Sequence, residues 1–153
     1  MGMEIDWVNV RRVMDAHGAR VVAEMRTRLQ GHGKEASGRL IRSLGYEIVE
    51  REGEIELVFV GADYAVYVDK GRRPGRMPPL ENIRDWCRLR NIPVAAAYPI
   101  ARKIGLEGIR PTNFASISML RNRKRYDGQV EEAAATDVAE ALTALINENL
   151  GKQ

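Results

Sequence analysis

Few side chains in this sequence are of the kinds that carry out catalysis, and they are not placed together. The two histidines, His17 and His32, lie in or just after a predicted helix, far along the chain from the single cysteine, Cys87. A Cys–His nucleophile pair and a zinc site both need these residue types side by side. We expect His17 on the helix surface, His32 in a turn, and Cys87 as a buried, unreactive thiol beside Trp86.

Sequence motifs for nucleotide or metal chemistry are missing as well. Neither GxxxxGK[ST] nor GxGxxG occurs. The nearest segment, residues 71–76, has a loop composition but lacks the Lys and Ser/Thr that hold a nucleotide and magnesium, so it can bind an anion only generically. The glutamates between residues 47 and 56 are spaced like solvated strand and turn residues. The sequence therefore predicts no catalytic, cofactor-binding or metal-binding residues, and a protein that is not an enzyme.

Basic residues are concentrated in the middle of the chain. Residues 70–125 contain 14 basic and 3 acidic side chains, residues 1–69 contain 9 and 12, and residues 126–153 contain 1 and 6. Arginine supplies 19 of the 24 basic residues, and its planar guanidinium group favours bidentate contact with carboxylates or phosphates. A polyanionic partner, complementary contacts between subunits and an arginine-rich coding bias all explain this distribution.

Seven of these charges lie in two short polar segments that we expect to be basic loops. Isolated buried charges cost several kcal/mol, so these side chains must face solvent, an acidic neighbour or DNA. Our preferred arrangement places the first loop against the acidic C-terminal helix of an adjacent subunit. The basic residues are Arg72, Arg73 and Arg76, then Arg121, Arg123, Lys124 and Arg125, and the acidic residues are Glu131, Glu132, Asp137 and Glu140. The lesser alternative is contact with the DNA backbone through Arg72, Arg73, Arg76, Arg121 and Arg123.

The bulk properties suit a single domain covering residues 1–153. A chain of this length can bury roughly two thirds of its unfolded surface in one core. No apolar run approaches the roughly 20 residues that cross a bilayer, and the N-terminus lacks a secretory signal. One cysteine excludes an internal disulfide. We therefore expect a protein that is made in a cytoplasm and contacts no membrane.

The spacing of apolar residues predicts an α+β fold. A helix is expected over residues 7–30, ended by nearby glycines. Alternating residues predict strands over 46–51 and 54–60 and a third over 64–69, which together form an antiparallel meander with one packed face.

Further helices are expected in the second half of the chain. Pro79 favours a helix start, and Pro93 prevents continuation beyond about residue 91. A helix over 97–106 should end at Gly108. Residues 111–125 fit helix and strand patterns equally well and are expected to be irregular or extended. An amphipathic helix over 129–149 closes the chain.

Motifs between residues 36 and 114 resemble one known family. The strings ASGRLIRSL (36–44) and ADYAVYVDKGRRPG (62–75) are similar to the patterns (S/T)G-x-L-x-x-S and YAxYVExG of bacteriophage tail-completion proteins, the family of minor tail and head–tail connector proteins. MPPLENIRDWC, AYPIARKIGLEGI and RPTNF look like a subgroup with a helical insertion. Asp69 stands where the family often has Glu, and SISMLRNRKR replaces the common Ala-rich helix.

The resemblance implies a structural protein of a tailed phage or prophage virion, with a long N-terminal helix packed on the antiparallel β-meander. Such a protein joins head and tail, or completes the tail, by assembling into a ring at the neck. It implies contact with other virion proteins, namely a connector, tail terminator or tail tube. Homo-oligomerisation is expected, and closed cyclic symmetry favours a ring of about six or twelve copies. Non-specific contact with packaged DNA is the lesser option. The location implied is the virion neck or tail, after synthesis in the host cytoplasm.

The second motif contains Tyr64 and Tyr67, which are candidate interface residues. On a strand they would point to opposite faces, so that one could enter the core while the other reached a neighbouring subunit. Packing of both within the sheet is the equal alternative. A different class of function also stays open: a cytoplasmic, phage-encoded nucleic-acid-binding module that uses the basic block 70–125. No recognition motif accompanies that block, so such binding would depend on backbone charge and on salt.

Overall fold

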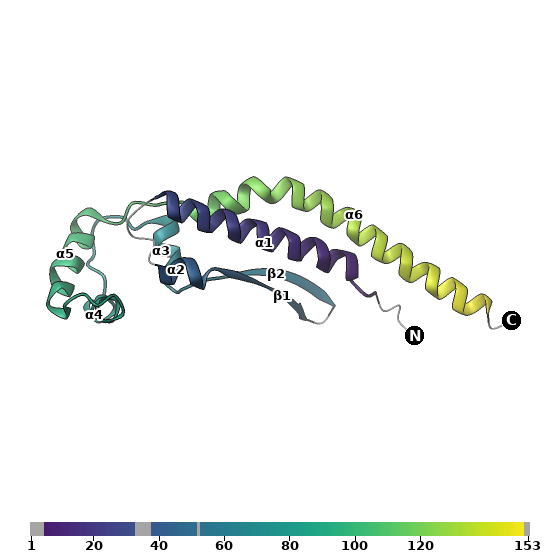
Figure 1. The fold of residues 1–153 in the computed structure, drawn as a ribbon, viewed down its shortest axis with the longest axis horizontal. Coiled ribbons are helices and arrows are strands. Elements are labelled where there is room, and N and C mark those ends of the chain that lie inside the picture. Colours follow the sequence, from purple (N-terminus) through teal and green to yellow (C-terminus); the bar gives the residue numbers. More distant parts are fainter. Residues whose placement is uncertain (1–4, 33–37, 52, 152–153) are drawn as a thin grey trace. The chain divides into compact units, whose positions relative to one another are not determined.

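The protein has the α+β fold that its sequence predicts. The computed structural model describes residues 5–32, 38–51 and 53–151. In chain order the elements are α1 (Val8–Gly31), α2 (Gly38–Ser43), β1 (Gly45–Arg51), β2 (Glu54–Val60), α3 (Ala65–Lys70), α4 (Leu80–Leu89), the 3-10 helix η1 (Val94–Ala96), α5 (Ala97–Glu107) and α6 (Phe114–Leu150), as Figure 1 shows.

The chain forms two compact units. One, here called the discontinuous unit, combines Met1–Ala62 with Phe114–Gln153, and the other, the inserted unit, is the continuous segment Asp63–Asn113. The first contains α1, α2, the two strands and α6, and the second contains α3, α4, η1 and α5. Folding of residues 1–153 as a single domain stays a prediction.

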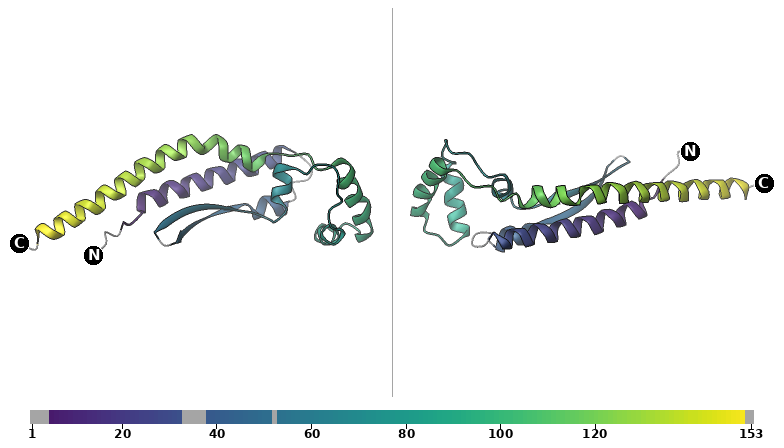
Figure 2. Two further views of the ribbon diagram at one scale, coloured as in Figure 1. Left: turned by 180° about the vertical axis from the view of Figure 1, so that it is seen from behind. Right: turned by 90° about the horizontal axis from the view of Figure 1, so that it is seen from above.

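Helices α1 and α6 lie side by side and run antiparallel in the discontinuous unit (Figures 1 and 2). The buried side of α1 repeats at three- and four-residue spacings, as the sequence predicts. Its members are Val10, Met14, His17, Gly18, Val21, Val22, Met25 and Leu29. Val10 and Met14 pack with Ala133 of α6 and with Ile48 and Leu57 of the strands. The hydrophobic core of this unit therefore lies between α1, α6 and one face of the hairpin.

The sheet has two antiparallel strands instead of the three expected. Tyr46 pairs with Phe59 and Ile48 with Leu57 on the face toward α1. The predicted bounds of the second strand are confirmed, and the first strand begins one residue earlier than predicted, at Gly45. Gly53 turns the chain between them with a positive φ of 87°. Glu52, expected in this turn, lies outside the described residues, as do Gly33, Ala36 and Ser37.

The third strand of the expected meander is wrong, because residues 65–70 form helix α3. Six residues are too few for their alternation to separate a strand from a helical turn. Contacts elsewhere in the inserted unit favour the helix. The backbone carbonyls of Val68 and Asp69, at its C-terminal end, accept hydrogen bonds from the amides of Thr112 (3.1 Å) and Asn113 (2.9 Å).

Residues 114–125 are also helical, which corrects the irregular or extended structure expected for them. They form the first three turns of α6, a helix of 37 residues. The side of these turns that faces α1 carries Phe114, Ser118 and Asn122 at four-residue spacing, and two of the three are polar. The apolar periodicity that reveals a helix is therefore absent here. The other predicted helices are confirmed within two residues at α4 and one residue at α5.

Candidate assembly surface

The first basic segment, residues 72–76, is a loop whose backbone is held by the rest of the inserted unit. Arg72 and Ile109 form an antiparallel bridge, in which each amide donates to the other residue's carbonyl over 2.9 and 2.8 Å. The amide of Gly75 donates to the carbonyl of Gly105 over 2.7 Å. The loop that the sequence predicts is thus present, and hydrogen bonds fix it at both ends.

Two glycines make this bridge sterically possible. Gly71 and Gly108 have positive φ values of 68° and 74°. A Cβ atom on Gly71 would lie 2.4 Å from the Ile109 carbonyl oxygen, and one on Gly108 would lie 2.2 Å from that of Arg72. Both separations are far below van der Waals contact, so no other residue fits at either position without moving the backbone. From the sequence alone, Gly108 is predicted only as a helix stop.

The three arginines of this loop differ in what their side chains do. The Arg72 guanidinium group donates a hydrogen bond to the Arg76 carbonyl over 2.9 Å and so braces the loop. Arg73 and Arg76 are exposed, and within the described part of the chain their side chains form no ion pair. Arg73 and Arg76 are therefore available for contact with an external carboxylate or phosphate.

The second basic segment, residues 121–125, lies on helix α6 and is not a loop, which corrects the expectation. Arg121 lies 3.7 Å from Glu24 of α1, and Arg123 lies 3.7 Å from Asp127 one turn later. Lys124 and Arg125 are exposed and form no ion pair with the residues that the structure describes. All four side chains are solvent-exposed, as the cost of burying charge requires.

Glu24 anchors this part of α6 to α1. Its carboxylate accepts hydrogen bonds from Asn122 over 2.8 Å and from Arg28 over 3.0 Å. Burial raises the pKa of Glu24, but the bonds from Asn122 and Arg28 outweigh burial and lower the pKa below its ordinary value. Because this contact is polar, no apolar periodicity in the sequence indicates it.

Tyr64 and Tyr67 do not point to opposite faces of a strand. Tyr64 is the N-terminal flanking residue of α3, where its carbonyl accepts the amides of Tyr67 and Val68. Residues three apart in a helix lie on neighbouring positions of one side. Tyr64 is half-buried, and Tyr67 is 54% exposed. Tyr67 alone therefore remains a surface candidate for contact with a partner.

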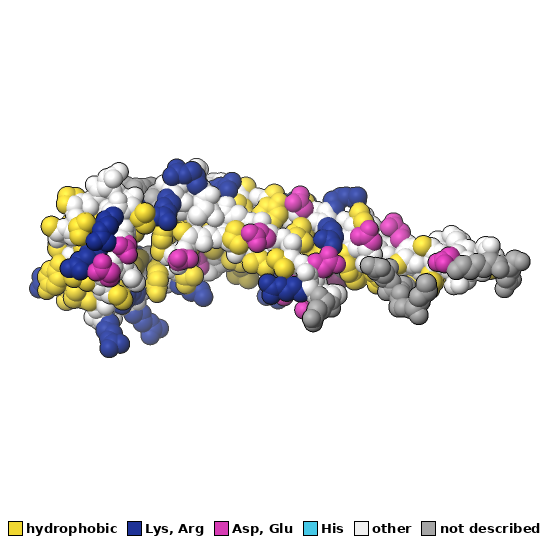
Figure 3. Space-filling model, turned by 90° about the horizontal axis from the view of Figure 1, so that it is seen from below, with side chains coloured by type: hydrophobic (Ala, Val, Ile, Leu, Met, Phe, Trp, Pro, Cys, Tyr) yellow, Lys and Arg dark blue, Asp and Glu magenta, His cyan; other side chains and the backbone are white. Residues whose placement is uncertain are grey.

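An acidic surface faces away from α1 on the hairpin. Paired residues share a face, so Glu47 and Val58, Val49 and Glu56, and Arg51 and Glu54 all point outward. The three glutamates are exposed and form no ion pair with described residues. In Figure 3, acidic and basic side chains both stand among apolar ones on the side of this unit away from α6. We call Glu47, Glu54, Glu56, Val58 and Val60 the acidic hairpin face.

Asp137 is not part of an acidic surface, contrary to the expectation for the C-terminal helix. It is buried, at 2% exposure, and its carboxylate binds the first turn of α1. It accepts hydrogen bonds from the Asn9 amide (3.0 Å), the Val10 amide (3.0 Å) and the Asn9 side-chain amide (2.7 Å). Burial raises the pKa of Asp137, but these hydrogen bonds prevail and lower it. Asp137 therefore caps a helix that begins 129 positions before it in the sequence.

His17 is buried instead of lying on the helix surface. Its ring stacks on that of Tyr126 with centroids 4.0 Å apart, and it meets Phe59 edge-on. Burial, with a smaller contribution from Arg20, lowers the pKa of His17 below its ordinary value. Burial also raises the pKa of Tyr126. Cys87 is fully buried, as predicted.

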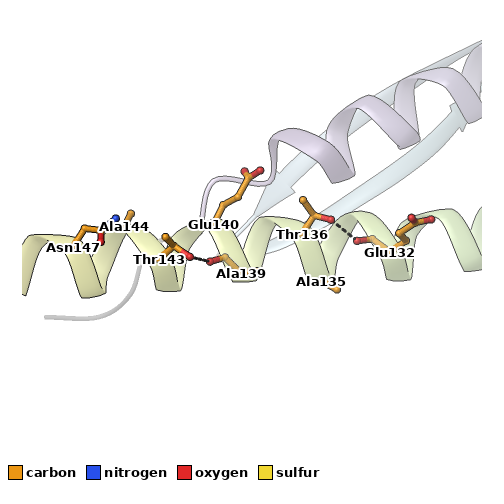
Figure 4. A pocket seen from close by; sticks show the side chains of 8 residues that line it. All are labelled: Glu132, Ala135, Thr136, Ala139, Glu140, Thr143, Ala144 and Asn147. Carbon is orange, nitrogen blue, oxygen red and sulfur yellow. Dashed lines mark hydrogen bonds between the residues drawn. The ribbon is translucent and has the colours of Figure 1, made fainter.

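The described residues show an open hollow and no candidate metal site. Residues 5–32, 38–51 and 53–151 contain no group of three or more His, Cys, Asp or Glu side chains able to hold a metal ion. The same ranges contain no helix with the length and apolarity needed to cross a bilayer. One open hollow, shown in Figure 4, is lined by a single face of α6 between Glu132 and Asn147.

Comparison with known proteins adds no relative. No known protein family, curated protein or solved structure matches this chain. The geometry of the described residues and the short motifs in the sequence therefore carry the functional inference.

Proposed function

We propose that this chain is a structural subunit of a tailed-phage or prophage virion that assembles into a ring at the neck or tail end. Two things support the proposal: the order of the motifs between residues 36 and 114, and the basic loop 72–76. The loop is the stronger support, because its backbone is fixed by hydrogen bonds and its Arg73 and Arg76 side chains are exposed and unpaired.

A charged loop of this kind is suited to docking. Its backbone is already ordered, so little conformational entropy is lost when a partner binds. Guanidinium groups form bidentate contacts with carboxylates. The acidic hairpin face offers three unpaired glutamates beside Val58 and Val60, each 37% exposed. We take the hairpin face of a neighbouring copy as the partner surface, because its glutamates stand beside exposed valines, whereas Asp137 of the C-terminal helix is buried against α1.

Such a contact is head-to-tail, because the basic loop of one copy binds a different surface, the acidic hairpin face, of the next copy. Repetition of such a contact produces a ring when its rotation closes. The ring would then join a connector, a tail terminator or the tail tube. No chemical reaction is required, because the subunit acts by fixing the positions of its neighbours.

The double variant Arg73→Ala/Arg76→Ala tests this function. We expect purified particles to contain much less of the subunit, while the melting temperature of the isolated chain stays nearly unchanged, because exposed charges contribute little to folding. Quantitative mass spectrometry of particles and thermal unfolding measure the two effects.

The matched control is Arg84→Ala/Arg88→Ala, which removes the same charge from α4 of the same unit. Those side chains pair with Glu81 (2.9 Å) and Asp85 (2.5 Å) of their own helix. Normal incorporation of the control and loss of the loop variant support the proposal. A wild-type chain absent from purified virions, or a loop variant that is incorporated normally, contradicts it.

Nucleic-acid binding is the second candidate, favoured by the charge of the inserted unit. That unit contains ten basic and five acidic residues. If binding depends on phosphate contacts alone, the logarithm of the binding constant should fall steeply and linearly with the logarithm of the salt concentration. A titration of the full chain with duplex and single-stranded DNA at several salt concentrations measures this slope. Failure to retain either DNA at low salt removes the candidate.

A further inference from the structure

Charges of opposite sign lie on either side of Gly128 on the exposed side of α6. Lys124 and Arg125 precede this glycine, and Glu131 and Glu132 follow it. All four side chains are exposed, and none forms an ion pair with a residue that the structure describes. The helix therefore presents unsatisfied positive charge one turn before Gly128 and unsatisfied negative charge one turn after it.

Gly128 itself has no explanation within the chain. It lies in the interior of a 37-residue helix, where glycine is less favourable than alanine. A Cβ atom at this position would meet no atom within 4 Å. Close packing inside the subunit therefore does not require the missing side chain, whereas close approach of a second helix from outside would.

Apolar side chains continue the same exposed side in both directions. Leu120, two turns before Gly128, is 70% exposed. Two turns after it the helix exposes Ala135 and then Ala139, which line the open hollow of Figure 4. Leu120 lies eight residues before Gly128 and Ala135 lies seven residues after it, so a large apolar side chain on one half of the face has a small one at nearly the same separation on the other half.

We propose that two copies of this chain pair through this face of α6, antiparallel, with the two-fold axis at Gly128. A helix rises about 1.5 Å per residue, so Lys124 lies about 6 Å before Gly128 and Glu132 about 6 Å after it. In the antiparallel pair Lys124 of each copy meets Glu132 of the other, with Arg125 beside Glu131. Leu120 of each copy packs over Ala135 of the other, and the glycines allow the two helices to approach closely.

Charge complementarity identifies the occupant as a second copy. A parallel pair would place Lys124 against Lys124 and Glu132 against Glu132, which is repulsive, so only the antiparallel arrangement satisfies both charges. The contact is isologous, since both copies use the same surface. It leaves the basic loop and the acidic hairpin face unoccupied, so it does not depend on the proposed ring or on a place in a virion.

Charge exchange in the full chain tests the pairing by sedimentation equilibrium. Lys124→Glu should weaken self-association roughly tenfold, because one attraction becomes a repulsion at two symmetric positions. Glu132→Lys should do the same. Combining both changes in one chain should restore the wild-type dissociation constant, and a mixture of the two single variants should form mixed pairs.

A matched pair of cysteine variants tests the direction of the helices. Gly128→Cys should be joined to its copy by a short bis-maleimide, because the two positions meet at the axis. Asn147→Cys, exposed on the same helix, should not be joined, since its two copies would lie about 57 Å apart. The natural Cys87 is fully buried and stays in both variants, with the unmodified chain as background.

Several outcomes overturn this inference. They are a wild-type chain that stays monomeric at its highest soluble concentration, a double exchange that fails to restore association, and cross-linking at residue 147 or at neither position. A paired chain that is absent from virions would leave the inference intact and contradict only the proposed function.

Discussion

Replacement of Asp137 by alanine should strongly destabilise the discontinuous unit, although the residue lies in a surface helix. The change removes the side-chain cap of α1, which costs about 1–2 kcal/mol at a typical helix start. It also leaves the buried Val10 amide without its acceptor, which costs about 1–3 kcal/mol. These two effects overlap, so we expect the free energy of unfolding to fall by about 2–4 kcal/mol.

Trp7 provides the assay, because it precedes α1 and packs against the Val10–Met14–Ala133 cluster. The sequence has two tryptophans, so a Trp86→Phe background makes the fluorescence specific for this unit. Urea unfolding at pH 7 then gives the free energy directly. The Asp137→Asn variant keeps one oxygen acceptor and should lose about half as much as Asp137→Ala.

The effect should also depend on pH in a defined direction. The pKa of Asp137 is lowered in the fold, so its stabilisation is fully present above the ordinary Asp pKa of about 3.9 and is lost as pH falls through the lower folded pKa. The difference between wild type and Asp137→Ala should therefore shrink in acid. The control is Glu140→Ala, exposed one turn later, which should change stability by less than about 0.5 kcal/mol. Equal stability of Asp137→Ala and Glu140→Ala would refute the capping role.

Three other changes have outcomes that the structure predicts. Because burial lowers the pKa of His17, the unfolded chain takes up a proton first, so stability should fall as pH drops below about 6.5, and His17→Phe should flatten this dependence in urea titrations. Gly71→Ala places a Cβ against the Ile109 carbonyl at positive φ and should cost more than about 1 kcal/mol, seen as a lower melting temperature. Asn122→Ala leaves the Glu24 carboxylate short of a donor and should cost about 1–2 kcal/mol in urea unfolding.

Each of these changes has a matched control. His32→Gln alters an exposed histidine and should change the free energy of unfolding by less than about 0.5 kcal/mol. Gly31→Ala lies in a helix, where a Cβ meets no atom within 4 Å, and should be neutral or slightly stabilising. Asn149→Ala removes only a bond to the Leu145 carbonyl on an exposed turn. Should any control match its test variant, the explanation given for that variant would be wrong.

Sequence reasoning found the elements whose signal is local and apolar. Helix α1 repeats valine, methionine and leucine at helical spacing, and the two strands alternate over seven residues each, so their bounds followed within a residue. The start of α6 was missed because Ser118 and Asn122 stand on its inner side. Residues 65–70 were misassigned because so short a run satisfies two periodicities at once.

Asp137 shows why the candidate site was harder to predict than the fold. A helix start is normally recognised from a capping side chain in the same segment. At α1 the residue before the helix is Trp7, whose side chain accepts no hydrogen bond from the first turn. The acceptor is Asp137 of α6 instead. The cost of burying a charge is enough to predict that the arginines are exposed. It does not predict their ion pairs, since Glu24 and Arg121 lie 97 positions apart in the sequence.

The two units cannot fold at the same stage of synthesis, because one of them needs residues from both ends of the chain. The inserted unit is one continuous segment, so it can fold once residue 113 has been synthesised. Helix α1 and the hairpin are synthesised first. Their apolar side packs against Ala133, and the first-turn amides of α1 bond to Asp137, and both residues belong to α6, which is synthesised last. A segment whose packing partner has not yet been synthesised exposes apolar surface, and it tends to aggregate or to recruit chaperones. We therefore expect truncation before α6 to yield an insoluble nascent chain, although every residue up to 113 is intact.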